Sequence, residues 1–343
     1  MPAALAEGDG WISSWWLAGG LAVLGLLALG WGVMRRRRRR RAWPVVVLTV
    51  VVFCAAVLVG VNAYTGYVPN WSAAKLLVTG QWAGERGGHV TTVQIPVNDS
   101  LLAGRDVTYV YTPPGYDPSG HTKYPVLYLV HGTPGQSSDW FSAGGAAHTM
   151  DVLVDYEIVR PMIIVGVDAN GVGLADTECL NSSMGGPQVE TYLNDVVVPW
   201  VDAHYPTKTD WAHRSIGGMS MGGFCALDQA LRHQELYASF IAIEPFESPG
   251  TGEMPPLTPE EVERYSPGKY IPSLVFQHPV PSFLAYGETA RGGDSSETEG
   301  LADQLRDRGQ SVSLHEVAGE GHTWPMAGQA LPYGLEFVSN HMP

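Results

Sequence analysis

Two long apolar stretches lie near the amino-terminus, and a run of seven arginines separates them. The first covers about residues 12–34 and the second about 43–63, with the arginines at 35–41. About 20 apolar residues in a helix span a bilayer, and short loops rich in Lys and Arg stay in the cytoplasm. Residues 1–64 are therefore predicted to form a two-helix transmembrane hairpin with a cytoplasmic arginine loop. A cleaved signal peptide fits less well, because its basic residues would precede the first apolar span.

The chain after the hairpin consists of two segments that differ in composition and in hydrophobic pattern. Residues 65–88 are rich in Pro, Gly, Asn and Ser and are predicted to be a juxtamembrane linker. From residue 89 to 343, short apolar runs alternate with segments of helical spacing, which is typical of one α/β domain. Alternating polar and apolar residues at 90–97 and 106–112 predict an antiparallel β-hairpin at a sheet edge.

Continuous apolar runs predict strands that are buried on both faces of a mainly parallel sheet. The predicted strands cover residues 124–130, 162–168, 214–219, 239–243, 281–286 and 311–317, and the predicted helices cover 191–204, 223–233, 296–308 and 326–340. The segment 247–280 contains seven prolines and is predicted to be an irregular insertion over the site. The expected fold class is α/β, a mainly parallel sheet with helices on both faces, preceded by the transmembrane hairpin.

Charge is distributed unevenly along the chain. The net charge is −14, but from Tyr64 onward 13 basic residues face 32 acidic ones. An acidic domain binds nucleic acid poorly, so no nucleic-acid partner is expected. The chain has three cysteines. Cys54 lies in the second apolar span, whereas Cys179 and Cys225 lie in the α/β domain. In an oxidising compartment these two can form a disulfide, and two unpaired core thiols fit the sequence equally well.

The candidate nucleophile is Ser220, within Gly218-Met219-Ser220-Met221-Gly222. An apolar run precedes this G-x-S-x-G motif and a helical pattern follows it. In such a motif the serine occupies a strained turn between strand and helix, and glycines flank it because the turn leaves little room for a Cβ atom. The spacing predicts a hydroxyl that is held clear of the sheet, near the positive end of the next helix.

Two further segments supply the rest of an acyl-transfer site. His131-Gly132-Thr133-Pro134-Gly135 follows a buried strand directly, where an oxyanion loop is expected. The backbone N–H groups of Thr133 and Met221 are the candidate oxyanion donors, and His131 is expected to be a structural hydrogen-bonding residue. His322 follows the last predicted strand on a glycine-flanked loop, and it is the candidate general base.

The acid that orients the histidine is expected in the turn after strand 281–286. This turn offers Glu288 and Asp294. Glu288 is slightly preferred because it lies closer to the end of the strand. Asp294, with Glu297, also fits an N-cap box for the next helix. The sequence has no metal-binding motif and no nucleotide-binding loop, so no cofactor and no metal are expected.

These motifs together resemble the putative-esterase family of α/β-hydrolases, which includes esterase D-like enzymes, feruloyl esterases and mycolyltransferases. The resemblance covers about residues 90–340. It rests on His131-Gly132, Asp139-Trp140, Glu190-Thr191-Tyr192-Leu193, Gly218–Gly223 and Gly321-His322-Thr323-Trp324. The hairpin and arginine loop are similar to those of membrane-anchored actinobacterial members. The resemblance implies an α/β-hydrolase fold and acyl-ester chemistry, without specifying the acyl group.

The expected function is that of a serine esterase or acyltransferase that forms an acyl-enzyme on Ser220. The hairpin predicts a location in the cell membrane with two spans and with the catalytic domain outside the cytoplasm. The expected substrate is a small-molecule ester or a lipid or cell-envelope ester. Two alternatives remain: a non-catalytic binding or scaffold protein on the same fold, and a serine peptidase, which uses the same kind of triad.

Overall fold

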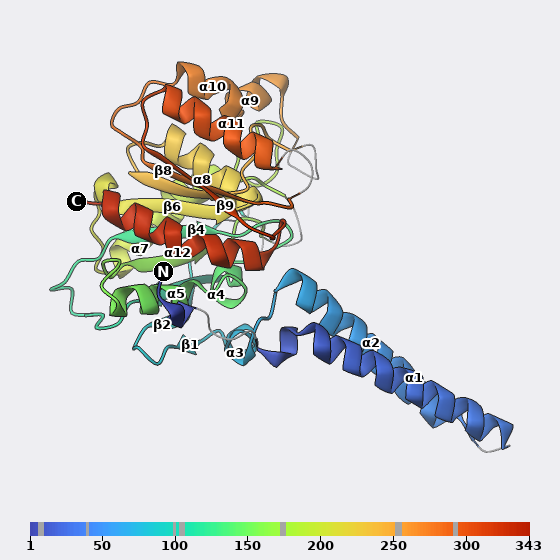
Figure 1. Ribbon diagram of the computed structural model, residues 1–343. Coiled ribbons are helices and arrows are strands. Elements are labelled where there is room, and N and C mark those ends of the chain that lie inside the picture. Colours follow the sequence, from blue (N-terminus) through green and yellow to red (C-terminus); the bar gives the residue numbers. More distant parts are fainter. Residues whose placement is uncertain are drawn as a thin grey trace.

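The computed structural model describes residues 1–5, 10–38, 41–98, 101–102, 107–171, 176–250, 256–290 and 294–343, without the side chain of Asp294. Two helices, α1 (Trp15–Arg37) and α2 (Trp43–Thr65), pack along each other and project from an α/β domain (Figure 1). Both are long and apolar enough to cross a membrane. Arg35, Arg36 and Arg37 form the last turn of α1, whereas Arg39 and Arg40 of the predicted loop lie outside the described residues.

Local signals explain the ends of both helices. The Ser14 side chain accepts a hydrogen bond from the N–H of Leu17 and caps α1, and Gly66 ends α2 in the left-handed conformation. The N-terminal turn η1 (Ala3–Leu5) lies against the α/β domain, where the backbone oxygen of Ala4 is 3.1 Å from Nε2 of His148. Both the amino-terminus and the α/β domain therefore lie at the same end of the hairpin (Figure 1).

The described residues form a sheet of nine strands in the order β1-β2-β3-β5-β4-β6-β7-β8-β9. The three pairs from β1 to β5 are antiparallel and the remaining pairs are parallel. The strands are β1 (Trp82–Ala83), β2 (His89–Gln94), β3 (Val107–Thr112), β4 (Val126–Val130), β5 (Ile163–Val167), β6 (Arg214–Met219), β7 (Ser239–Ile243), β8 (Ser282–Gly287) and β9 (Val312–Val317). The predicted edge hairpin and the mainly parallel sheet are both confirmed.

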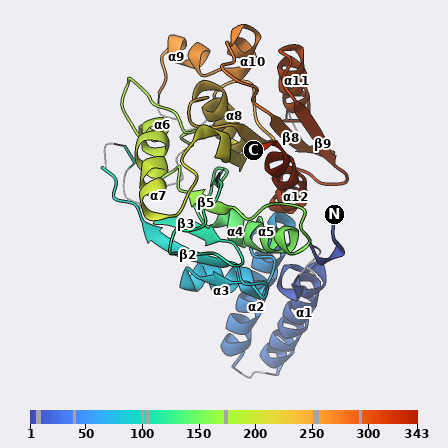
Figure 2. The ribbon, with the colours of Figure 1, turned by 90° about the vertical axis from the view of Figure 1, so that its left-hand side faces the viewer.

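Helices cover both faces of this sheet (Figure 2). The remaining helices are α3 (Trp71–Thr79), α4 (Asp139–Ser142), α5 (Ala146–Asp155), α6 (Val189–Thr191), α7 (Val198–His204), α8 (Met221–Arg232), α9 (Pro259–Arg264), α10 (Pro267–Tyr270), α11 (Asp294–Asp307) and α12 (Trp324–His341). A π-helical turn, η3 (Tyr192–Val197), joins α6 to α7, and shorter 3₁₀ turns are η2 (Trp11–Ser13), η4 (Trp211–His213) and η5 (Ile271–Ser273). One core cluster includes buried residues of α7, α8 and α11, and a second includes those of α5 and α12.

The predicted juxtamembrane linker, 65–88, and the predicted irregular insertion, 247–280, both contain regular structure. The segment 65–88 includes α3, whose Asn70 side chain caps its first turn, and the edge strand β1. The proline-rich segment 247–280 includes α9, capped by a reciprocal pair between Thr258 and Glu261, and α10. Residues 251–255 of this segment lie outside the described residues.

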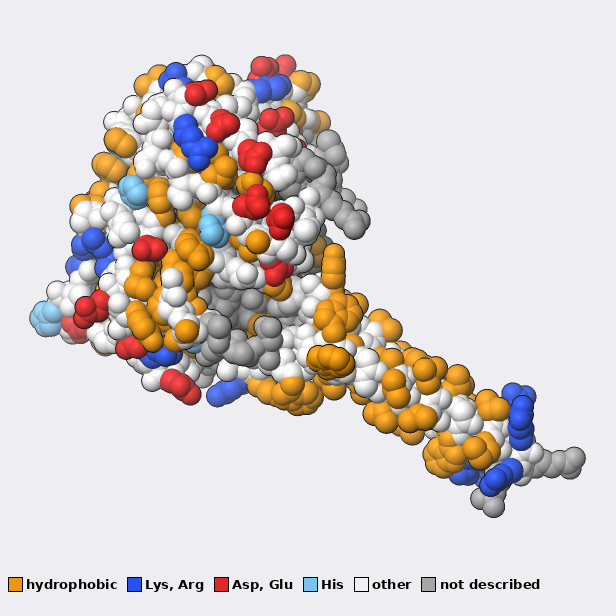
Figure 3. Space-filling view, in the orientation of Figure 1, with side chains coloured by type: hydrophobic (Ala, Val, Ile, Leu, Met, Phe, Trp, Pro, Cys, Tyr) orange, Lys and Arg blue, Asp and Glu red, His pale blue; other side chains and the backbone are white. Residues whose placement is uncertain are grey.

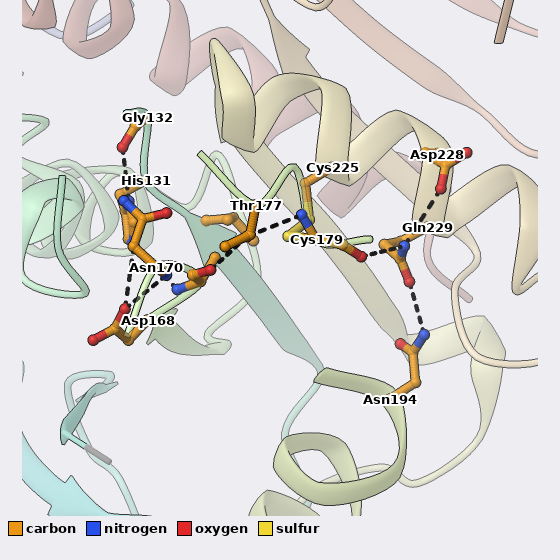
Figure 4. The surroundings of a disulfide bond; sticks show 12 residues. His131, Gly132, Asp168, Asn170, Thr177, Cys179, Asn194, Cys225, Asp228 and Gln229 are labelled. Atoms are coloured by element: carbon orange, nitrogen blue, oxygen red, sulfur yellow. Dashed lines mark hydrogen bonds and ion pairs between the residues drawn. A yellow bond between two sulfur atoms is a disulfide. The ribbon is translucent and has the colours of Figure 1, made fainter. Parts of the chain in front are cut away.

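A disulfide joins Cys179 to Cys225 and links the loop after β5 to helix α8 (Figure 4). Both residues are buried. The backbone N–H of Cys179 donates to Oγ1 of Thr177 at 3.3 Å, and Nε2 of Gln229 donates to the carbonyl of Cys179 at 3.4 Å. Of the two alternatives that the sequence left open, the structure has the paired form. Disulfides persist in oxidising compartments.

Removing this disulfide is expected to lower the free energy of unfolding. The cysteines are 46 residues apart, and closing a loop of that length constrains the unfolded chain by about 4 kcal/mol. We expect Cys179→Ser/Cys225→Ser to unfold at a clearly lower denaturant concentration than the wild type. The matched control is Cys54→Ser, which changes an exposed free thiol. Equal midpoints for the double variant and the control would contradict the stabilising role.

Candidate functional site

The turn between β6 and α8 holds Ser220 in a strained conformation, with φ 59° and ψ −122°. Such a conformation costs roughly 1–3 kcal/mol for a non-glycine residue. The N–H of Ser220 donates to the carbonyl of Ile243 at 2.8 Å, which ties the turn to the neighbouring strand. A Cβ atom on Gly218 would lie 2.1 Å from the carbonyl oxygen of Gly222, and one on Gly222 would lie 2.1 Å from that of Val130. Both glycines of the motif are therefore required by close backbone contacts.

His322 lies just before the N-cap of α12 and faces a buried carboxylate. Its Nδ1 is 2.7 Å from Oε2 of Glu244, whose side chain is fully buried. The other carboxylate oxygen of Glu244 accepts a hydrogen bond from the N–H of Gly287 at 3.2 Å. The His322 side chain is 38% exposed, so part of the imidazole contacts Glu244 and part of it is accessible to solvent. Nδ1 faces Glu244, and Nε2 is the other ring nitrogen of His322.

The structure adds Glu244 as a third candidate acid beside Glu288 and Asp294, the two that the sequence offers. Glu288 lies in the predicted turn, but its Oε2 accepts a hydrogen bond from the N–H of Gly319 at 2.7 Å. It thereby holds the loop that carries His322, and the Nδ1 of that histidine faces Glu244 instead. Asp294 begins α11, and its side chain lies outside the described residues. The histidine loop lies over the end of β8, where the N–H of Thr289 donates to the carbonyl of Glu320, and the imidazole faces Glu244 at the end of β7.

The sequence itself carries a signal for Glu244. Glu244 follows the buried strand β7 directly, and β7 pairs in parallel with the nucleophile strand β6. A lone carboxylate at the carboxyl end of a buried strand is unusual, because unpaired buried charges are costly. Glu244 also has a positive φ of 48°, which turns its side chain away from the regular path of the strand.

The loop predicted to form the oxyanion site lies beside Ser220. A Cβ atom on Gly132 would lie 3.4 Å from Cβ of Ser220, so the backbone just before Thr133 reaches the nucleophile. His131 is buried, and its Nε2 accepts a hydrogen bond from the N–H of Ala169 at 3.1 Å while Nδ1 lies 2.8 Å from the carbonyl oxygen of Gly132. It is the structural hydrogen-bonding residue that the sequence suggested.

Helix α8 begins at Met221, the second predicted donor. The first N–H groups of a helix have no partner within that helix, so the N–H of Met221 is suited to receive an oxyanion. The backbone of Met221 follows the nucleophile directly, and that of Thr133 follows the close approach at Gly132. The geometry thus brings both predicted donors next to Ser220.

An unpredicted contact connects this loop to the end of the hairpin. The hydroxyl of Tyr67, just after α2, donates to Oδ2 of Asp139 at 2.5 Å, and the N–H of Gln136 donates to the same oxygen at 2.9 Å. Burial, together with the adjacent Asp139, raises the pKa of Tyr67, so its hydroxyl stays protonated. Asp139 therefore joins the loop 131–136 to the segment that follows α2.

These residues surround one pocket of about 220 Å³. It is lined by Tyr64, Thr65, Tyr67, Gly132, Thr133, Pro134, Met219, Ser220, His322, Thr323 and Trp324. The nucleophile, the candidate base and the oxyanion loop thus share a cavity, although they come from three distant parts of the sequence. None of the lining residues comes from the described part of segment 247–280, which contributes Tyr265 and Leu257 to a hydrophobic cluster with Phe224 of α8.

A second buried acid near the oxyanion loop makes stability depend on pH. Burial, with the nearby Asp176 and Asp228, raises the pKa of Glu178 from 4.5 to about 8. The folded protein then holds a proton that the unfolded chain loses above its ordinary pKa. The contribution of this group to the free energy of unfolding is largest below pH 4.5. It declines between pH 4.5 and about pH 8, by at most about 1.4 kcal/mol per pH unit.

Glu178→Gln is expected to flatten this dependence. The amide oxygen can still accept the hydrogen bond that Oε1 of Glu178 now receives from the N–H of Gly250 at 2.7 Å. We expect the variant to unfold at a higher temperature than the wild type at pH 8 and at a similar temperature near pH 4.5. Glu263→Gln, at an exposed glutamate, is the matched control. A variant that follows the wild type at both pH values would contradict the assignment.

Comparisons with known proteins agree with this geometry. Residues 102–290 match the family model described as putative esterase. The chain is 34% identical over 166 residues to an uncharacterized protein of Corynebacterium glutamicum, and 35% identical over 132 residues to an esterase of Mycobacterium tuberculosis. These alignments cover 47% and 38% of this chain but only 38% and 27% of those proteins.

A solved structure of a ferulic acid esterase has the same fold. It superposes with a TM-score of 0.62 at 26% identity and covers 74% of this chain and 98% of its own. The matched family region includes the nucleophile turn, the oxyanion loop and Glu244. The chain therefore belongs to the putative-esterase family of α/β-hydrolase fold.

Proposed function

We propose that this esterase is a serine enzyme, tethered to the membrane by its hairpin, that acts on carboxylic esters outside the cytoplasm through an acyl-enzyme on Ser220. One observation supports this most directly. Ser220 and His322 line the same pocket, and Oε2 of Glu244 lies 2.7 Å from Nδ1 of His322. A nucleophile, a general base and an orienting acid are the groups that ester cleavage by a serine requires.

In the proposed reaction, Oγ of Ser220 attacks the ester carbonyl carbon while Nε2 of His322 takes the hydroxyl proton. The carbonyl oxygen becomes an oxyanion between the N–H groups of Thr133 and Met221, each worth roughly 3 kcal/mol. The bond to the leaving alcohol then breaks, and His322 returns the proton to that alcohol. Water or a second hydroxyl then attacks the carbonyl carbon of the acyl-enzyme and gives its proton to His322. The bond between the acyl group and Oγ of Ser220 breaks, and His322 returns the proton to that oxygen.

Glu244 supports both halves of this reaction. A carboxylate at Nδ1 fixes the tautomer that leaves Nε2 ready to accept a proton, and it stabilises the imidazolium that forms. The burial of Glu244 strengthens this effect, because the charge–charge interaction is screened less than at the surface.

The location outside the cytoplasm is supported by three features. The arginines lie at the end of the hairpin far from the α/β domain, where the positive-inside rule predicts the cytoplasm. The amino-terminus lies against the domain at the opposite end. The disulfide between Cys179 and Cys225 suits an oxidising compartment.

Hydrolysis and acyl transfer share every step up to the acyl-enzyme. They are separated by offering p-nitrophenyl esters to the purified full chain, with and without a sugar acceptor such as trehalose. Release of p-nitrophenol with free acid alone assigns hydrolysis, and acylated sugar assigns transfer. Absence of turnover with esters of short and long acyl chains would contradict the proposed function.

A further inference from the structure

The pocket at Ser220 is partly built from the membrane hairpin. Tyr64 and Thr65, at the end of α2, line it together with Ser220 and His322. A larger hollow of about 580 Å³ lies next to it and shares Tyr64, His322 and Thr323 with the first. Its other lining residues are Trp15, Ala63, Thr289, Gly319, Glu320, Gly321 and Pro325. Both cavities therefore lie where the histidine loop meets the outer ends of α1 and α2.

This junction is fixed by direct contacts. A Cβ atom on Gly66 would lie 2.5 Å from Cδ of Pro325, so the chain leaving α2 passes directly over the start of α12. The Asn62 side chain accepts from the N–H of Val68 at 2.8 Å and donates to the carbonyl of Val68 at 2.9 Å. Tyr67 then reaches Asp139. The hairpin is thus packed against the catalytic machinery rather than joined to it by an extended spacer.

The same end of the hairpin carries exposed aromatic residues. Trp15 is 62% exposed, Trp16 is 91% exposed and Tyr64 is 68% exposed. Trp11 and Trp71, which contact each other edge to face, are also exposed. Tryptophan and tyrosine favour the interface between lipid and water. Figure 3 shows hydrophobic side chains continuing from the hairpin onto its junction with the domain, with basic side chains at the opposite tip.

We infer that the enzyme takes its substrate from the outer surface of the bilayer that holds its own hairpin, and that this substrate is an amphiphilic acyl ester dissolved in that bilayer. The inference rests on the proposed function. The interfacial aromatic residues set the level of the membrane surface, and His322 lies beside two of them, Trp15 and Tyr64. An ester carbonyl in a bilayer lies near that level. An acyl chain can then remain in the lipid while its carbonyl reaches Ser220.

The test compares two ways of presenting one ester to the full chain in proteoliposomes. A long-chain p-nitrophenyl ester is dissolved either in the same neutral bilayer as the enzyme or in separate enzyme-free vesicles. An uncharged probe is used because the described lining residues of both cavities include no lysine or arginine. We expect at least tenfold faster p-nitrophenol release when ester and enzyme share a bilayer, because a long acyl chain exchanges slowly between vesicles.

Two rates are compared for Tyr64→Ala: the rate on the shared-bilayer ester and the rate on soluble p-nitrophenyl acetate. We expect the ratio of the first to the second to fall by about tenfold. Tyr156→Ala, at an exposed tyrosine of the α/β domain, is the matched control and should leave both rates unchanged. Equal rates for the two presentations, with acetate turnover that still requires Ser220, would overturn the inference but not the proposed function. Loss of all turnover, acetate included, would overturn the proposed function itself.

Discussion

Ser220→Ala is expected to reduce ester turnover by about 10⁴-fold or more, because no other group can form the acyl-enzyme. The oxyanion donors belong to the backbone and remain in place, so substrate binding should change little. Alanine adopts the same positive φ at a cost similar to that of serine, and the fold should therefore be retained. The measurement is kcat for a p-nitrophenyl ester, with thermal unfolding as the check on folding.

Ser273→Ala is the matched control, since Ser273 is an exposed serine in η5 whose hydroxyl donates to the carbonyl of Tyr270 at 3.3 Å. It should retain wild-type kcat. A folded Ser220→Ala protein that retained more than a few per cent of the activity would contradict the assignment of the nucleophile.

Glu244→Gln is expected to lower kcat by about 10³–10⁴-fold, as replacement of the acid does in other triads. The amide can still accept from the N–H of Gly287, so the packing should be preserved. It cannot hold Nδ1–H of His322 as a carboxylate does, nor can it stabilise the imidazolium. The measurement is kcat at a pH where His322 is neutral, together with the unfolding temperature.

Glu288→Gln separates Glu244 from Glu288, the slightly preferred of the two acids that the sequence offers. Its amide oxygen can still accept the hydrogen bond from Gly319, so the histidine loop should stay in place and kcat should fall by less than about tenfold. A large loss in Glu288→Gln, with near-normal activity in Glu244→Gln, would reverse the assignment and restore the acid that the sequence favoured.

The contrast between these acids shows what the sequence could predict. Ser220 was identified because its signal is local: a strand, two glycines and a helix lie within a few residues. His322 was found because it lies between the last strand and the last helix. The acid depends instead on the path of the histidine loop across the ends of β7 and β8. Neither strand alone reveals that path.

Long-range contacts were also beyond the sequence pattern. The link from Tyr67 to Asp139 joins residues 72 positions apart, and no periodicity in either segment indicates it. The disulfide remained one of two alternatives, because pairing depends on how the loop after β5 folds back onto α8. The hydrophobic pattern, in contrast, predicted the described strands from β2 to β9 and the helical segments of α6 to α8, α11 and α12, since burial dictates that pattern directly. It did not predict β1 or the helices α3, α4, α5, α9 and α10.

The central claim is that Ser220 is an activated nucleophile, and covalent labelling tests it most directly. The full chain is treated with a fluorophosphonate, digested, and mapped by mass spectrometry. We predict one adduct on Ser220 that is absent from Ser220→Ala and forms far more slowly in Glu244→Gln than in Glu288→Gln. A folded protein that forms no adduct, or forms it on a different residue, would contradict the account.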